Sequence, residues 1–231
     1  CSKLTVNFIT YYNKTFLMEG FFIHLIDLIW LYLNFILKFS RKRSIMISEK
    51  LIKGQLLIAE PSIIGHLSFN RSVILLADHD KEGSVGFIIN KPLKYTIHDL
   101  IPEINARFKI FNGGPVEQDN LYFIHNIPDL IPNSIEISNG IYWGGDFECT
   151  KELINKGKIG RRNIRFFLGY TGWEEQQLES EMNDNSWIVA QNSYKNKIIG
   201  KSSTHFWKEQ IIELGGEYLI WSNAPENPHL N

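Results

Sequence analysis

Three groups of residues have types and spacings that could support chemistry. The first is Asp78-His79-Asp80, which places three possible ligands or proton carriers on one loop, and His66 and His125 could join them in space. The same tripeptide suits an ordinary turn, because aspartate side chains readily bond to nearby backbone groups. The turn is the preferred interpretation, and a metal or acid–base site is the alternative.

The second group is a basic run, Lys156-Gly-Lys-Ile-Gly-Arg-Arg-Asn-Ile-Arg165, which contains no acidic residue. Its cations are Lys156, Lys158, Arg161, Arg162 and Arg165. Such a run can bind a phosphate group or an anionic partner. It can equally be a solvated turn that leads into a strand, as most runs of charge are. Both interpretations stay open on the sequence alone.

The third group consists of glycine pairs and near-pairs in the segments 112–115, 143–146 and 169–173. Glycine permits positive φ and close backbone approach, which serves either a tight corner of the fold or a ligand. Corners are the preferred interpretation.

Several well-known motifs are absent. Gly200-Lys201-Ser202 resembles the end of a phosphate-binding P-loop, but Lys195 stands where that loop requires its first glycine. There is no Gly-x-Gly-x-x-Gly, His-Glu-x-x-His or Cys-x-x-Cys pattern, and Gly169-Tyr-Thr-Gly172 lacks the serine of a nucleophile elbow. The sequence therefore predicts no cofactor, no metal site and no catalytic residue.

The elements that must position these groups are typical of one mixed α/β domain. The chain has 231 residues, of which 44% are hydrophobic and 21% charged, enough to bury a core. Short apolar runs bounded by turn residues predict strands at 54–59, 72–77, 84–89, 108–111, 121–124, 164–168 and 187–190. Capping residues and apolar spacing predict a short helix after Thr96 and longer ones over 146–156, after 174 and from about 203 to 214. Hairpins and helical crossovers both occur, so a purely parallel sheet is not expected.

Residues 1–45 are a different kind of chain. They carry six basic and two acidic groups, a charge of +4, whereas the rest of the chain carries −5. Within them, 21–37 is almost wholly apolar, near the lower limit of about 17–25 residues that a membrane-spanning helix needs. The preferred interpretation is an over-extended reading frame with the true start at Met46. The alternatives are a hydrophobic anchor, which would leave the remainder in the cytoplasm, or an amphipathic helix.

Seven segments of the globular part resemble the YqgE/AlgH family of bacterial proteins. They are 54–61, 69–76, His79 with 83–92, 113–116, 167–173, 177–179 and 225–231. The resemblance implies that 46–231 is a single YqgE/AlgH-like domain and that 1–45 lies outside it. It further implies a bent, bifurcated mixed β-sheet that forms a pseudo-barrel flanked by helices.

The resemblance implies less about function than about fold. The family is often labelled a transcriptional regulator because of an association with alginate production. A globular part of charge −5 with scattered basic residues and no helix-turn-helix pattern does not favour direct DNA binding. We therefore predict a cytoplasmic accessory or regulatory protein, not an enzyme, that acts through a protein partner or a small anionic ligand. It would contact a membrane only if 21–37 is expressed and inserts.

The alternative function is a small-ligand-binding protein or an enzyme with a glycine-lined cleft. The candidate ligand-binding residues of that cleft are Arg71, His79, Asn90, Lys91, Gly113 and Gly114. The cleft requires their side chains to converge on one concave surface.

Overall fold

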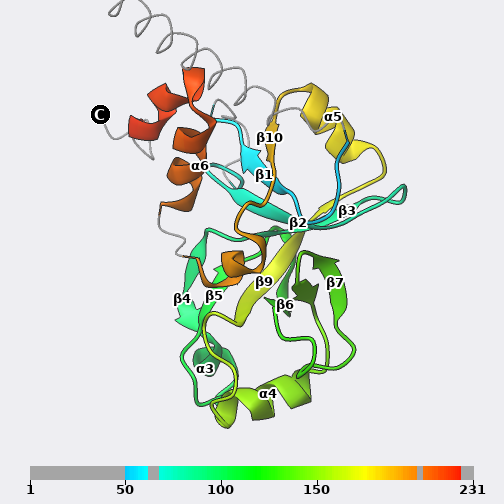
Figure 1. Cartoon of the computed structure of the whole chain (residues 1–231), viewed down its shortest axis with the longest axis vertical. Coiled ribbons are helices and arrows are strands. Elements are labelled where there is room, and N and C mark those ends of the chain that lie inside the picture. The colour runs from blue at the N-terminus through cyan, green and yellow to red at the C-terminus, as the bar shows by residue number, and fades with distance from the viewer. Residues whose placement is uncertain (1–49, 62–67, 202–204, 225–231) are drawn as a thin grey trace, which may run out of the picture. The chain divides into compact units, whose positions relative to one another are not determined.

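The computed structural model describes residues 50–61, 68–201 and 205–224 (Figure 1). The predictions for residues 1–45 and for His66 lie outside these ranges. Within them, no helix combines the length and the apolar character that crossing a membrane would take.

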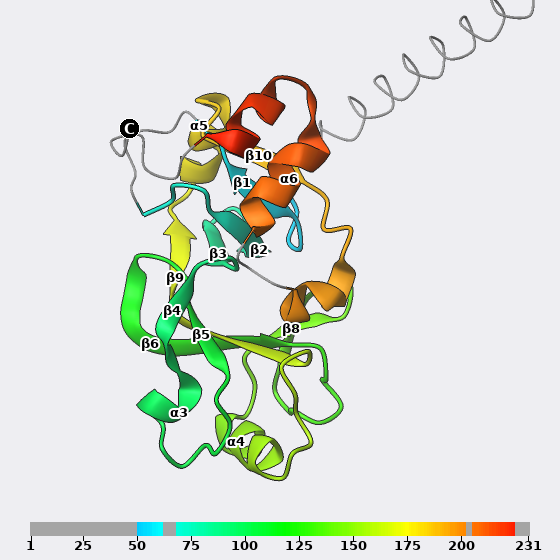
Figure 2. The same cartoon turned by 90° about the vertical axis from the view of Figure 1, so that its left-hand side faces the viewer.

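In the described part of the chain, ten strands make up the sheet. They are β1 (Leu56–Ala59), β2 (Val73–His79), β3 (Ser84–Ile88), β4 (Pro92–Thr96), β5 (Lys109–Asn112), β6 (Val116–His125), β7 (Ile135–Ser138), β8 (Ile141–Trp143), β9 (Ile164–Trp173) and β10 (Trp187–Ala190). The helices are α3 (Ile97–Leu100), α4 (Phe147–Asn155), α5 (Gln177–Asn183) and α6 (Phe206–Leu214), with 3₁₀ helices η1 (Lys195–Gly200) and η2 (Gly216–Asn223). Helices α5 and α6 lie toward one end of the sheet, and α3 and α4 toward the other (Figures 1 and 2).

The sheet divides along its central strand, β9. The strand order is β10-β1-β2-β3-β9-β6-β8-β7, and β4 joins through β5, which also pairs with β9. The first half of β9 pairs in parallel with β5 at residues 166–168. Its last three residues pair with β3 in antiparallel fashion. The other pairings are antiparallel. The predicted fold class, a bent and bifurcated mixed sheet flanked by helices, is therefore confirmed.

Two glycines allow the sheet to divide. Gly113 follows β5, and a Cβ built on it would lie 2.0 Å from the carbonyl oxygen of Gly169. A Cβ on Gly114, whose φ is +152°, would lie 2.2 Å from the carbonyl oxygen of Tyr170. No side chain fits at either position, so close contact between the two backbones accounts for both glycines.

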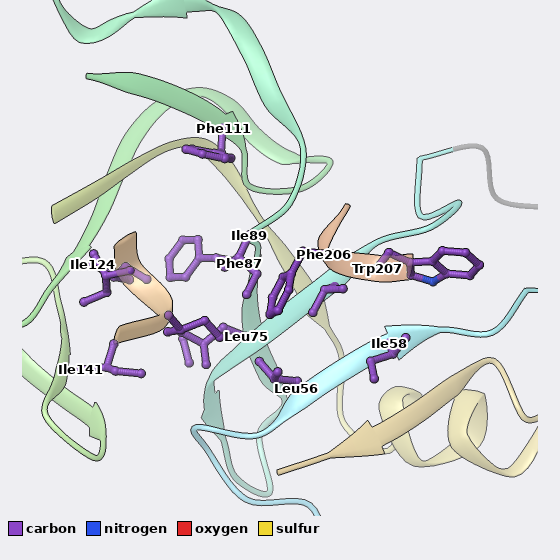
Figure 3. Close-up of a cluster of buried hydrophobic side chains, with 14 of the residues drawn as sticks. Leu56, Ile58, Leu75, Phe87, Ile89, Phe111, Ile124, Ile141, Phe206 and Trp207 are labelled. Atoms are coloured by element: carbon purple, nitrogen blue, oxygen red, sulfur yellow. The ribbon is translucent and has the colours of Figure 1, made fainter. Parts of the chain in front are cut away.

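The largest core cluster joins the first three strands to the C-terminal helices. Figure 3 shows its side chains, which include Phe87 of β3, Phe206 and Trp207 of α6, and residues of β1 and β2. The Trp207 indole N–H also donates to the Ala59 carbonyl at 3.0 Å. Each fully buried side chain of this size contributes about 1.5–3 kcal/mol, so α6 is held mainly by this face.

The structure departs from the predicted elements where strands are exposed. Strands β4, β7 and β8 were not predicted, and β6 and β9 are longer than their apolar runs. β4 begins at Pro92 and has no buried residue, so it presents no apolar pattern. The helix after Thr96 lasts only four residues and ends before Pro102, although its predicted cap is present, since Thr96 and Asp99 form a capping box.

Candidate functional site

A pocket of about 290 Å³, here called the basic pocket, lies where β5, the start of β9 and the end of η1 meet. Five cations line it: Arg107, Lys109, Arg161, Arg165 and Lys201. The remaining lining residues are Thr96, Phe108, Phe111, Ile164, Ile199 and Gly200. No Asp, Glu, His or Cys is among the lining residues.

The parallel pairing of β5 with β9 brings two of these cations together. Ile110 pairs with Phe166, so the same register places Lys109 next to Arg165. Paired residues on neighbouring strands lie about 5 Å apart and point to the same face of the sheet. Lys201, which follows η1, approaches from a distant part of the chain, because its backbone carbonyl accepts a hydrogen bond from Arg165.

Arg165 is the most deeply buried cation of the pocket. Its side chain is 6% exposed. Nη1 donates to the Ile89 carbonyl at 2.7 Å, Nη2 donates to the Lys201 carbonyl, and the guanidinium lies 4.5 Å from the centre of the Phe111 ring. Burial lowers the pKa of Arg165 to about 10, which leaves it charged at neutral pH. Among the described residues no carboxylate forms an ion pair with it.

The other four cations differ in how their charge is compensated. Lys201 forms an ion pair with Glu209 at 2.7 Å and lies 4.6 Å from the centre of the Tyr194 ring. Arg107 lies 3.9 Å from Asp99 and is largely exposed. Lys109 and Arg161 have no carboxylate within ion-pairing distance in the described part of the chain.

The predicted basic run is divided by the structure. Arg161 and Arg165 line the pocket. Lys156 caps the end of α4, where it pairs with Glu152 at 2.8 Å, and Lys158 and Arg162 are exposed without lining the pocket. Sequence reasoning missed Arg107, Lys109 and Lys201, because only the β5–β9 pairing and η1 bring them to this place.

Of the six residues of the predicted glycine-lined cleft, the structure does not bring Arg71 and His79 together. Arg71 precedes β2 and His79 ends it, so the strand between them spans about 20 Å at about 3.3 Å per residue. Arg71 donates to the Ala224 carbonyl at 2.7 Å and lies over the Trp207 ring. His79 Nδ1 lies 2.8 Å from Ser84 Oγ, within the same hairpin.

Asn90 and Lys91 bond to the segment that leads into β2. Asn90 Oδ1 accepts from the Val73 N–H, and its Nδ2 donates to the Arg71 carbonyl, each at 2.8 Å. Lys91 Nζ donates to the Ser68 carbonyl at 2.7 Å, and burial lowers the pKa of Lys91 to about 8. None of the six cleft residues lines the basic pocket or the groove described next.

A second concavity, here called the acidic groove, has a volume of about 630 Å³ and lies between the β2–β3 hairpin and the end of β9. Its acidic lining residues are Asp78, Asp80, Glu82 and Glu174. Asp78 and Asp80 accept hydrogen bonds from the backbone N–H groups of His79 and Glu82, at 3.1 and 2.8 Å. Asp80 therefore lies in the predicted turn, whereas Asp78 and His79 belong to strand β2. Among the described residues no cluster of three His, Cys, Asp or Glu has an arrangement that could hold a metal ion.

The architecture is that of a small mixed α/β protein with a curled sheet, and comparisons with known proteins identify its relatives. A family model described as AlgH-like matches residues 56–219. The UPF0301 protein BF2109 of Bacteroides fragilis is 40% identical over 183 residues, which cover 78% of this chain and 91% of that protein. A UPF0301 protein of Cytophaga hutchinsonii is also 40% identical, over 78% of this chain and all of its own length. The chain belongs to the AlgH-like family, as its sequence motifs predicted.

Solved structures share the fold at low sequence identity. The solution structure of the AlgH protein from Pseudomonas aeruginosa matches with a TM-score of 0.61 at 23% identity, covering 78% of this chain and 97% of its own. A crystal structure of a Corynebacterium diphtheriae protein matches with a TM-score of 0.63 at 19% identity, over 76% and 93%. None of these names states an activity.

Proposed function

We propose that the protein is a cytoplasmic, non-enzymatic accessory or regulatory protein that binds a small anionic ligand in the basic pocket. The observation that carries this proposal is the buried guanidinium of Arg165, which has no carboxylate partner among the described residues. A buried charge is costly unless it is compensated, and its bonds to two carbonyls compensate it only in part. An anion in the pocket would supply the missing charge.

The chemistry of the lining supports binding without turnover. General acid–base and nucleophilic catalysis most often use His, Asp, Glu or Cys, and in some enzymes Lys or Thr. The lining contains none of the first four, its lysines and arginines are suited to hold an anion in place, and the Thr96 hydroxyl already donates to Asp99. The compact basic pocket and the net negative charge of the globular part do not favour direct contact with DNA.

The proposal is tested by titrating pyrophosphate into the full chain at about 0.1 M ionic strength and measuring the dissociation constant by calorimetry. The double variant Lys109→Gln/Arg161→Gln removes two uncompensated cations that line the pocket. The matched control, Lys156→Gln/Lys158→Gln, removes two charges of the same basic run that lie outside it. We expect the first variant to bind at least tenfold more weakly and the control to change less than twofold, since its two lysines are exposed to solvent, which screens their charge, and do not line the pocket.

Three results would contradict the proposal. Absence of pyrophosphate binding to the unmodified chain would remove the anion site. Equal weakening in both double variants would show a diffuse positive surface in place of a pocket. Release of orthophosphate from pyrophosphate during incubation would show that the protein is an enzyme.

A further inference from the structure

The basic pocket is also partly apolar, which a site for a simple inorganic ion would not need. Phe111, Ile164 and Ile199 are buried around it, and Phe108 is half-exposed. Phe108 stacks on Phe166 with ring centroids 6.4 Å apart and planes 23° from parallel. An inorganic ion bound to the cations would leave this surface in contact with water, whereas an organic group would cover it.

The number of uncompensated charges indicates how many anionic groups the ligand has. Lys201 and Arg107 each have a carboxylate within 4.0 Å. Lys109, Arg161 and Arg165 have none among the described residues. A carboxylate ligand carries one negative charge and a phosphate monoester about 1.5 to 2 at neutral pH. Three cations without a carboxylate partner therefore match a ligand with more than one phosphate group better than a carboxylate or a phosphate monoester.

The cations differ in exposure, which gives the pocket an inner and an outer end. Arg165 is 6% exposed and held by two carbonyls and the Phe111 ring, so its fork of donors is fixed before a ligand arrives. Arg107 and Arg161 are exposed, and Arg161 Nη2 donates to the Arg107 carbonyl at 3.5 Å. One anionic group can thus bind at the inner end while a second binds at the rim.

We infer that the basic pocket binds an organic diphosphate. One phosphate group contacts Arg165 and Lys109, the second contacts Arg161, and the organic body lies against Phe108. This inference rests on the proposed function and adds to it the class of the ligand. A free nucleotide and a prenyl diphosphate share this chemistry and differ in whether the body is a flat ring or a hydrocarbon chain.

The test compares dissociation constants on the full chain at one ionic strength for acetate, phosphate, pyrophosphate, ADP and geranyl diphosphate. We expect pyrophosphate to bind at least tenfold more tightly than phosphate, and phosphate more tightly than acetate. At least one organic diphosphate should bind at least tenfold more tightly than pyrophosphate. Preference for ADP would assign a ring as the organic body, and preference for geranyl diphosphate would assign a chain.

A variant of the apolar wall separates the two parts of the ligand. Phe108→Leu keeps an apolar side chain but removes the ring face, so binding of the preferred organic diphosphate should weaken at least fivefold while that of pyrophosphate stays within twofold. The matched control is Tyr95→Leu, which removes an exposed aromatic ring of β4 that does not line the pocket. Arg165 itself is left intact, because its variants also lose bonds that hold the fold together.

The possible failures are distinguishable. If no anion binds, the proposed function is wrong. If anions bind but pyrophosphate is no tighter than phosphate, or neither organic diphosphate is tighter than pyrophosphate, the pocket is a general anion site and only this inference fails. Tighter binding of polyglutamate than of ADP would also overturn it, in favour of an acidic protein partner.

Discussion

The basic pocket and the acidic groove lie at opposite ends of the same strand, β9, and differ in more than the sign of their charge. The groove is the larger, about 630 Å³ against about 290 Å³. Its aspartates, Asp78 at the end of β2 and Asp80 in the hairpin turn, are exposed to water and bond to nearby backbone N–H groups. The pocket instead contains Arg165, which is 6% exposed. Burial of an uncompensated charge, and not the size of a concavity, is therefore what distinguishes a candidate binding site here.

Each end of β9 is also held by one charged side chain that bridges two elements. At the basic end, Arg165 donates to carbonyls that follow β3 and η1. At the other end, Glu181 Oε2 of α5 accepts from the indole N–H groups of Trp173 and Trp187, at 2.9 and 2.7 Å. Arg165 itself lines the basic pocket, whereas Glu181 lies behind its partner Trp173, which lines the acidic groove. Only the Arg165 bridge places its own charged group in the lining of a concavity.

The largest effect is expected from Arg165→Leu. It leaves the Ile89 and Lys201 carbonyls without their donor, and each unsatisfied buried group costs about 1–3 kcal/mol. We expect the free energy of unfolding to fall by about 2–3 kcal/mol and pyrophosphate binding to be lost. Urea denaturation and calorimetry measure the two quantities. Unchanged stability together with unchanged binding would remove Arg165 from both roles.

Glu181→Leu should have a comparable but somewhat smaller effect on stability and none on anion binding. Two indole N–H groups lose one shared acceptor, which we expect to cost about 2 kcal/mol. Glu181→Gln keeps an acceptor oxygen and should cost less than half as much. Urea denaturation of both variants checks the order, and a change of pyrophosphate affinity beyond twofold would show that the two ends of β9 are coupled.

The strands that could be predicted from the sequence are those whose residues are apolar and buried. The runs around Val73 and Trp187 predicted β2 and β10 within one or two residues, because both strands are buried. Exposed strands such as β4 lack that pattern and were missed. The family motifs supplied the bent and divided sheet, which no local pattern encodes.

The candidate site was predicted only in part, for a physical reason. The basic run indicated Arg161 and Arg165 because they are close in sequence to other cations. Lys109 and Lys201 reach the same pocket through parallel strand pairing and the position of η1, which are long-range features. Burial of Arg165 could not be read from a run of charge, because such a run favours exposure.

A pH-dependent stability is expected from His125, which pairs with Ile164 beside the basic pocket. His125 is fully buried, its Nε2 lies 3.1 Å from the Gly144 carbonyl, and its Nδ1 accepts from the Ile127 N–H. Burial lowers the pKa of His125 below its ordinary value of 6.5, so the unfolded chain takes up a proton first as the pH falls. Stability is complete above about pH 6.5 and decreases below it, by at most about 1.4 kcal/mol per pH unit.

The measurement is urea denaturation between pH 7.5 and 5, with His125→Gln as the variant. Glutamine can still donate to the Gly144 carbonyl but does not titrate in this range, so the variant should lose the part of the pH dependence that His125 contributes. An identical slope in both proteins would show that other groups cause it.

The smallest effect is expected at the acidic groove, where Asp80→Asn removes one negative charge. The amide oxygen can still accept from the Glu82 N–H, so the free energy of unfolding should change by less than about 0.5 kcal/mol, as for most exposed substitutions. Pyrophosphate affinity should stay within twofold, since the length of β9 separates the groove from the pocket by more than a screening length of about 10 Å. Denaturation and calorimetry at 0.1 M salt measure both. A gain in affinity above threefold would mean that the groove repels the ligand across the molecule, and the two ends of β9 would then have to be treated as one electrostatic system.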